Sequence, residues 1–166
     1  MGTNQSPLRL AFVAPRLAAA GAVGGAETLI FNLASLASAA GLDVEFVTTC
    51  AKNHHTWENE FPEGEVIHEG IKVLRFPVNA NRNLNAFHEI QGRICRGVQV
   101  SDKDEEIWAR NSVNSDAMLS YLEKSNFDRI IVGPYLFGLT MAVADRFPEK
   151  TMLVPCLHDG AFARVR

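Results

Sequence analysis

The chain has 166 residues, of which 47% are hydrophobic and 21% charged, and its formal net charge is −3. This length and composition predict one globular domain with a sizeable core, and they exclude a disordered chain and a protein that binds nucleic acid through overall charge. No run reaches the ~18 apolar residues of a membrane span, and residues 1–7 lack the regions of a signal peptide, so we expect a cytoplasmic protein. The three cysteines are widely spaced without a CxxC pair, which predicts free, buried thiols rather than disulfides or a zinc site.

The first expected elements are a strand and a helix joined by a loop of small residues. Residues 8–14 form a short continuous apolar run, typical of a strand buried on both faces. A helix ended by Gly41 follows, because apolar residues recur at steps of three and four in one stripe: Leu29, Leu33, Leu36 and Ala40. The start of such a helix has unpaired amides and partial positive charge, so an anion is its natural ligand.

Two glycines in this loop bear on how closely a ligand can approach. Gly24 and Gly25 stand just ahead of Glu27, and without a Cβ they let the backbone come close to a phosphate or a sugar. A plain tight connection between strand and helix is the alternative interpretation of the pair. The loop is not a common nucleotide fingerprint, because a GxGxxG pattern is broken at its third position. A Walker loop is excluded too, since Ala26 and Glu27 stand where Lys and Ser or Thr are needed.

Strands and helices alternate along the rest of the chain. Strands are expected at 44–49, 65–69, 71–76, 127–132 and 151–157, and helices around 86–95, at 101–124 and at 135–147, with a polar surface loop at 52–64. This alternation predicts an α/β fold, a Rossmann-like three-layer sandwich with a mostly parallel sheet. Counting residues 65–76 as the third strand, we expect the order 3-2-1-4-5 with residues 8–14 central.

The distinctive polar residues of this sequence follow the strands at one edge of the predicted sheet. In an open parallel sheet, ligands bind outside the carboxyl ends of the strands where the strand order reverses. The residues expected to line a cleft there are Gly24, Gly25 and Glu27 after the first strand, Thr49 after the second, Tyr135 after the fourth, and His158 and Asp159 after the fifth. A lone histidine after a strand is more often structural, but the convergence of four loop ends favours a site. No GxSxG motif is present, and no Cys–His spacing suggests thiol catalysis.

Neither a metal site nor a strong membrane signal is expected. His54 and Glu58 are four residues apart but lack a third ligand at helical spacing, and Gly92 replaces the second histidine of an HExxH motif. Basic residues outnumber acidic ones between Lys72 and Arg96, which would suit anionic lipid or a phosphorylated acceptor. A solvated edge with scattered arginines is the simpler interpretation.

Several of these segments together resemble a known family. The apolar strand, the loop ending in GGAE (residues 24–27), the helix TLIFNLASLASAAG and the following DVEFVTT resemble the N-terminus of the family-4 retaining glycosyltransferases of the GT-B fold. The resemblance extends in order and spacing over nearly the whole chain. It ends at PCLHDGA (residues 155–161), which is similar to the segment of that family that carries a donor-facing histidine.

The resemblance implies a function and a set of roles. It implies transfer of a sugar, with retention, from a nucleotide-sugar donor to an acceptor, a cell-surface glycan or a lipid-linked precursor, in the cytoplasm or at the inner face of the membrane. Gly24 and Gly25 would approach the donor diphosphate and the sugar, His158 would be the catalytic residue that contacts the sugar, and no metal or other cofactor would be needed.

One large part of the family pattern has no counterpart in this sequence. The family's nucleotide-binding domain carries two glutamates separated by seven residues, whereas no two glutamates here stand eight positions apart. We therefore expect residues 1–166 to be an N-terminal, acceptor-side domain that is inactive alone. A stand-alone Rossmann-type module that binds a phosphorylated ligand is the alternative. A nicotinamide-dependent oxidoreductase is disfavoured by the broken fingerprint.

Overall fold

A computed structural model describes residues 7–17, 24–135, 137–156 and 159–165 of the chain. Its strands are β1 (Arg9–Val13), β2 (Asp43–Thr49), β3 (Gly64–His68), β4 (Ile71–Phe76), β5 (Arg129–Val132) and β6 (Thr151–Leu153). Its helices are α1 (Gly25–Ala39), α2 (Leu84–Cys95), α3 (Asp102–Asn111), α4 (Asp116–Lys124), α5 (Gly138–Arg146) and the short 3-10 helix η1 (Ala161–Arg164). None of the helices in these residues combines the length and apolarity needed to cross a bilayer.

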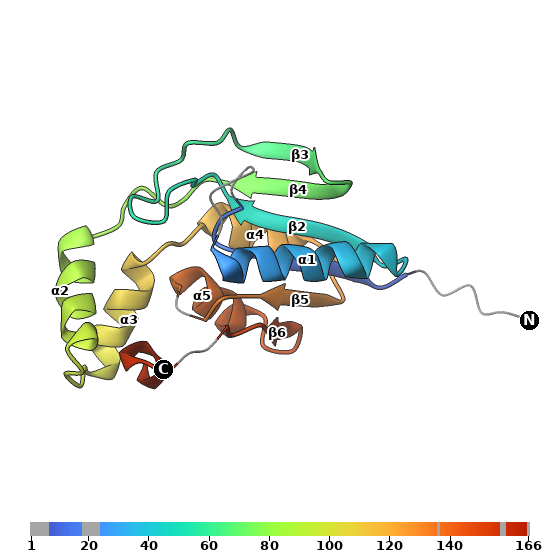
Figure 1. Cartoon of the computed structure of the whole chain (residues 1–166). Coiled ribbons are helices and arrows are strands. Elements are labelled where there is room, and N and C mark those ends of the chain that lie inside the picture. The colour runs from blue at the N-terminus through green and yellow to red at the C-terminus, as the bar shows by residue number, and fades with distance from the viewer. Residues whose placement is uncertain (1–6, 18–23, 136, 157–158, 166) are drawn as a thin grey trace, which may run out of the picture.

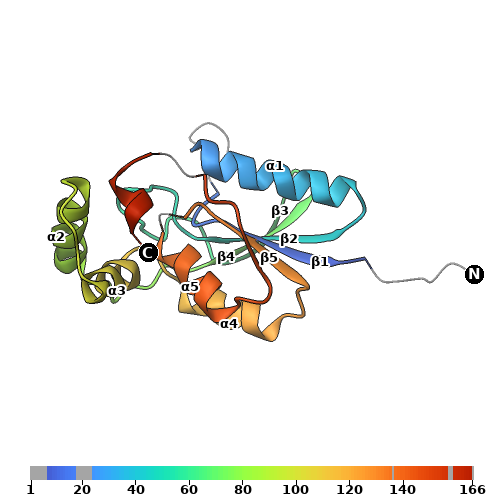
Figure 2. The same cartoon turned by 90° about the horizontal axis from the view of Figure 1, so that it is seen from below.

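The strands form one mostly parallel sheet in the order β3-β4-β2-β1-β5-β6 (Figure 1). Only β3 runs antiparallel, because a tight turn joins it to β4 at the outer edge. Helix α1 covers one face of the sheet, and α4 and α5 cover the other (Figure 2). The predicted α/β class and the order 3-2-1-4-5 are therefore confirmed, and the three layers are compatible with a Rossmann-like sandwich.

The central strand β1 is apolar from Leu10 to Val13 because both of its faces are covered there. Leu10 and Phe12 belong to the core on the α1 side, together with Ile30 of α1. Ala11 and Val13 belong to the core on the opposite side, which α4 and α5 complete with Met118, Leu122, Leu139 and Val143. Successive side chains of a strand point to opposite faces, so a continuous apolar run is what a strand between two helical layers requires.

The expected apolar stripe of α1 is only partly buried: Leu33 packs against the core on this side of the sheet, but other members do not. Leu29 is 44% exposed and Leu36 is 68% exposed, whereas Ile30, Phe31 and Ala34 are buried against the sheet. Nearly every position of this helix is apolar or small, so more than one stripe satisfies the helical period, and the fit to the sheet selects the one that carries Phe31. Phe31 packs edge-on against Phe46 of β2 with the ring centroids 5.3 Å apart.

The helix expected at 101–124 is two helices. Side chains between the two helices form hydrogen bonds to the backbone groups at the helix ends. Asn114 Nδ2 donates to the carbonyl of Ala109 at 2.8 Å, and Ser115 Oγ accepts from the amide of Met118 at 3.2 Å. The break also serves α5, because the carbonyl of Val113 accepts the amide of Leu139. The other boundaries differ less: β6 ends at Leu153 rather than 157, and of the three free cysteines only Cys50 is buried.

Helices α2 and α3 lie beyond the carboxyl ends of the strands, where they form a wall of their own (Figure 1). They pack on each other through Ile90, Ile94 and Trp108, and residues of η1 join this cluster. The wall therefore stands next to the sheet edge at which the sequence places its candidate site.

A buried carboxylate ties three strands and α4 together at the opposite, amino-terminal end of the sheet. Glu45 is 4% exposed and accepts hydrogen bonds from Arg9 Nη2 at 2.8 Å, from Lys72 Nζ at 3.3 Å and from the Tyr121 hydroxyl. Burial alone would raise the pKa of the Glu45 carboxyl, but the bonds from Tyr121 and Arg9 and the charge of Lys72 outweigh it, so its pKa is lowered. The charged form of Glu45 thus stabilises the fold.

Replacement of Glu45 tests this role. Glu45→Gln should lower the free energy of unfolding at pH 7 by about 1–3 kcal/mol, because it leaves partly buried cations without their carboxylate. A group whose pKa is lowered by folding stabilises above its unfolded pKa and loses that contribution as the pH falls through the folded one. Urea unfolding should therefore show that, between pH 7 and about pH 3, the free energy of unfolding falls more for the wild type than for Glu45→Gln.

The matched control is Glu65→Gln, because Glu65 also contacts Lys72 (3.2 Å) but its side chain is 54% exposed. Glu65→Gln should lower the free energy of unfolding by less than about 1 kcal/mol. Equal pH dependence of the wild type and Glu45→Gln would contradict the assignment.

Candidate functional site

A buried ion pair joins the end of β1 to the start of α1. Arg16 Nε donates to Glu27 Oε1 at 2.8 Å, and the two side chains are only 10% and 8% exposed. Arg16 Nη1 also donates to the carbonyl of Lys52 at 3.1 Å, so the same guanidinium holds the loop after β2. Glu27 was expected to line a cleft, and it lies at this edge of the sheet, but its carboxylate is engaged by Arg16.

The two glycines ahead of Glu27 differ in what surrounds them. A Cβ at Gly24 would overlap the Glu27 carboxylate and would lie 3.4 Å from Arg16 Nη2. A Cβ at Gly25 would have no described atom within 4 Å, and Gly25 itself is exposed. A side chain at Gly24 would thus displace the Glu27 carboxylate of the ion pair, whereas none of the described residues fills the space beside Gly25.

Two helices, α1 and α5, begin at this edge after buried strands, and the amides of their first turns differ in their hydrogen-bond partners. In α5 the amide of Gly138 donates to Ser112 Oγ at 3.1 Å and the amide of Leu139 to the carbonyl of Val113 at 2.8 Å. In α1 the N-cap is Gly24, and no side chain among the described residues caps it. The first amides of α1 have no partner within the helix, so this N-terminus is the one suited to an anion.

The loops after β5 and β6 approach the same place. The amide of Tyr135 donates to the carbonyl of Pro155 at 3.2 Å, which fastens the two loops to each other. The Tyr135 hydroxyl is buried without a hydrogen-bond partner in the described residues, and burial raises its pKa. Burial, together with the charge of Glu27, raises the pKa of Cys156, which favours the protonated thiol.

The remaining predicted site residues have different surroundings. Thr49 is fully buried, where its hydroxyl donates to the carbonyl of Pro15 and accepts from the amide of Ala51, so it fixes the ends of β1 and β2 to each other. Asp159 is exposed. His158, the predicted catalytic residue, lies outside the described residues, and its role stays a prediction.

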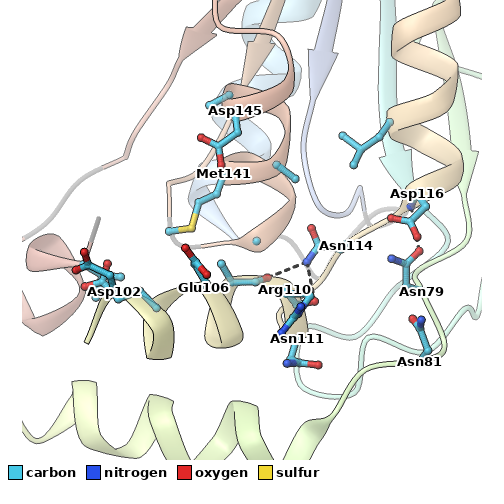
Figure 3. A pocket seen from close by; sticks show the side chains of 17 residues that line it. Asn79, Asn81, Asp102, Glu106, Arg110, Asn111, Asn114, Asp116, Met141 and Asp145 are labelled. Carbon is cyan, nitrogen blue, oxygen red and sulfur yellow. Dashed lines mark hydrogen bonds between the residues drawn. The ribbon is translucent and has the colours of Figure 1, made fainter. Parts of the chain in front are cut away.

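A cavity lies on the other side of this edge, between α3 and α5 and beside the start of α4 (Figure 3). It measures about 900 Å³, and five carboxylates line it against one cation, Arg110: Asp102, Glu105, Glu106, Asp116 and Asp145. The Asn114 amide that reaches it is bonded to the carbonyls of Ala109 and Arg110. An acidic lining repels a diphosphate, so this cavity is not the anion site.

A second cavity of about 500 Å³ adjoins the ion pair through the loop after β2. His54 lines it, and burial, His55 and Arg16 together lower the pKa of His54, which places this loop near the guanidinium. Sequence analysis did not identify the Arg16–Glu27 pair or this cavity, because each is assembled from segments that are distant along the chain. A charged residue directly after an apolar strand was the one available hint for Arg16.

The described residues hold no group of three or more His, Cys, Asp or Glu side chains with a geometry that could bind a metal ion. The chain matches no protein-family model, and no curated protein and no solved structure matches it either.

The contrast between the glycines gives a direct test. Gly24→Ala should destabilise the chain by about 1–3 kcal/mol, because the new methyl group displaces the Glu27 carboxylate from Arg16. Gly25→Ala should stay within about 0.5 kcal/mol of the wild type or be slightly more stable, because the methyl group enters open space and alanine favours the helix. Urea unfolding of both variants measures this, and equal losses would contradict the assignment.

Proposed function

We propose that this chain is the N-terminal, acceptor-side domain of a retaining glycosyltransferase of the GT-B type that takes its sugar from a nucleotide-sugar donor. In this proposal the start of α1 faces the donor diphosphate. The acceptor, a glycan or a lipid-linked precursor, binds on the side of α2 and α3. A second domain supplies the contacts to the nucleotide, so the chain does not catalyse transfer by itself.

The observation that supports the proposal most is the open N-terminus of α1 beside Gly25, at the carboxyl edge of the central strand. A departing nucleoside diphosphate gains negative charge, and preorganised amides stabilise that charge without having to reorient. The Arg16–Glu27 pair holds the first turn of the helix in place while leaving Gly25 exposed. Sequence resemblance to family-4 glycosyltransferases in the segment GGAE supports the same assignment.

A stand-alone module that binds a phosphorylated ligand would use the same amides. The two functions differ in affinity, because a module must hold its ligand with this domain alone, whereas a transferase domain presents only one wall of the cleft. A domain that presents only one wall of the cleft buries less of the ligand, so its contacts do not offset the entropy that is lost on association.

Binding of nucleotide sugars to the chain distinguishes them. Amide chemical shifts of residues 24–28 should respond to a panel of nucleotide sugars with a Kd above about 1 mM. Gly25→Val should abolish the response because its side chain fills the open space, while Gly21→Ala, earlier in the loop, should change it less. Micromolar affinity would favour the module, and an unchanged response in Gly25→Val would exclude the loop as the anion site.

His158 is tested by kinetics in a polypeptide that also contains the nucleotide-binding domain. If His158 contacts the sugar in the transition state, His158→Ala should lower kcat and kcat/KM together by roughly 100-fold or more and leave the melting temperature unchanged. If it is a structural histidine, the variant should lose about 1–3 kcal/mol of stability and its folded fraction should turn over normally. The second result would remove His158 from the site.

A further inference from the structure

The cavity of about 500 Å³ has aromatic walls that come from four separate segments. Trp57 belongs to the loop after β2, Phe87 to α2, Trp108 to α3, and Phe137 precedes α5. Its volume falls within the roughly 300–1,000 Å³ typical of small-molecule sites, and aromatic walls with a few polar groups are typical of such sites too. It is large enough for one or two sugar rings.

The aromatic walls are held in position before any ligand arrives. Trp57 packs edge-on against Phe137 with centroids 5.3 Å apart. Trp108 is only 2% exposed, because it stacks with Phe87 at 6.1 Å and with Phe162 at 5.9 Å. Trp108 Nε1 donates to Gln91 Oε1 at 3.3 Å. Trp57 has a φ of 57°, a left-handed conformation that costs energy for a residue with a large side chain and persists only where the surroundings enforce it.

One cation lines this cavity without an opposite charge to balance it. Arg82 Nε donates to the carbonyl of Asn111 at 3.1 Å, and no ion pair of Arg82 is found among the described residues. Burial lowers the pKa of the guanidinium, since a desolvated cation is costly without a counter-charge. Glu58 also borders the cavity, but it is exposed. The planar guanidinium fork matches a carboxylate or a phosphate.

Aromatic walls and an unbalanced guanidinium select one class of ligand. The C–H faces of a pyranose ring are apolar and can lie against the half-buried rings of Phe87 and Phe137, whereas its hydroxyl groups project from the rim toward polar side chains. We infer that this cavity binds a sugar ring that carries an anionic group, either a carboxylate or a phosphate, with the anionic group at Arg82. As the acceptor subsite, this inference rests on the proposed function, but the binding itself requires no donor.

The position of the cavity suits an acceptor. Helices α2 and α3 place it just beyond the carboxyl ends of the strands (Figure 1). His54 lies in its lining, two residues beyond Lys52, whose carbonyl accepts from Arg16, the partner of Glu27 at the start of α1. The cavity therefore adjoins the start of α1. A ring held here would therefore stand next to the place assigned to the donor.

The tryptophans provide the measurement, because the chain has two and both line this cavity. Fluorescence of the whole chain should be titrated with glucuronate, glucose 1-phosphate, glucose and inorganic phosphate. At least one of the two anionic sugars should bind at least about tenfold more tightly than glucose and than inorganic phosphate, because each of the latter supplies only half of the recognised features. The tighter of the two identifies the anionic group as a carboxylate or a phosphate.

Variants of Arg82 complete the test. Arg82→Gln should remove the preference for the anionic sugar over glucose, a loss of about tenfold or more, and Arg82→Lys should retain part of it. Arg96→Gln is the matched control, because Arg96 is exposed and outside this cavity and should leave binding unchanged. Thermal melts establish that each variant is folded.

The inference is overturned if glucose binds as tightly as both anionic sugars, if folded Arg82→Gln keeps the preference, or if none of the probes gives a saturable signal. These outcomes are separate from those of the proposed function. Binding here with no response at residues 24–28 to nucleotide sugars would leave the cavity assigned and reject the transferase. The reverse result would reject the cavity alone.

Discussion

The candidate site depends on the ion pair between Arg16 and Glu27. Both side chains are nearly inaccessible to water, and the charge of each offsets the cost of desolvating the other. Removal of either side chain would therefore leave an unpaired buried charge. Their bond fixes the end of β1 against the first turn of α1, and the second contact of Arg16, to the carbonyl of Lys52, adds the loop after β2. Gly24 is part of the same arrangement because a side chain there would displace the Glu27 carboxylate.

Two buried carboxylates thus serve the two ends of the sheet in different ways. Glu45, at the amino-terminal end, accepts hydrogen bonds from two cations and a tyrosine, and these bonds connect β2 to β1, β4 and α4. Glu27, at the carboxyl end, holds a guanidinium beside an uncapped helix N-terminus and an exposed glycine. The amino-terminal cluster connects strands to α4, whereas the carboxyl-terminal cluster holds the loop after β2 through the Lys52 carbonyl.

Charge also separates the two cavities near that edge. The larger one is lined by five carboxylates, so it has the wrong sign for a phosphate. The smaller one combines aromatic walls with Arg82 and adjoins the ion pair. The proposed anionic donor at α1 and the inferred anionic sugar at Arg82 would not compete, because the helix N-terminus would serve one and the guanidinium the other.

The sequence by itself determined the fold class, the strand order and the edge at which the loops converge. These follow from local patterns: buried strands read as apolar runs, glycines and prolines end the elements, and alternation of strands and helices leads to a parallel sheet. Tertiary structure decided the rest. Which stripe of α1 is buried depended on the fit of Phe31 to the sheet, and the break before α4 depended on Asn114 and Ser115 satisfying both helix ends. The pairing of Arg16 with Glu27 could not be predicted from the sequence, and neither could the gathering of four aromatic residues and Arg82 around one cavity. Contacts between distant segments leave no periodic trace in either segment.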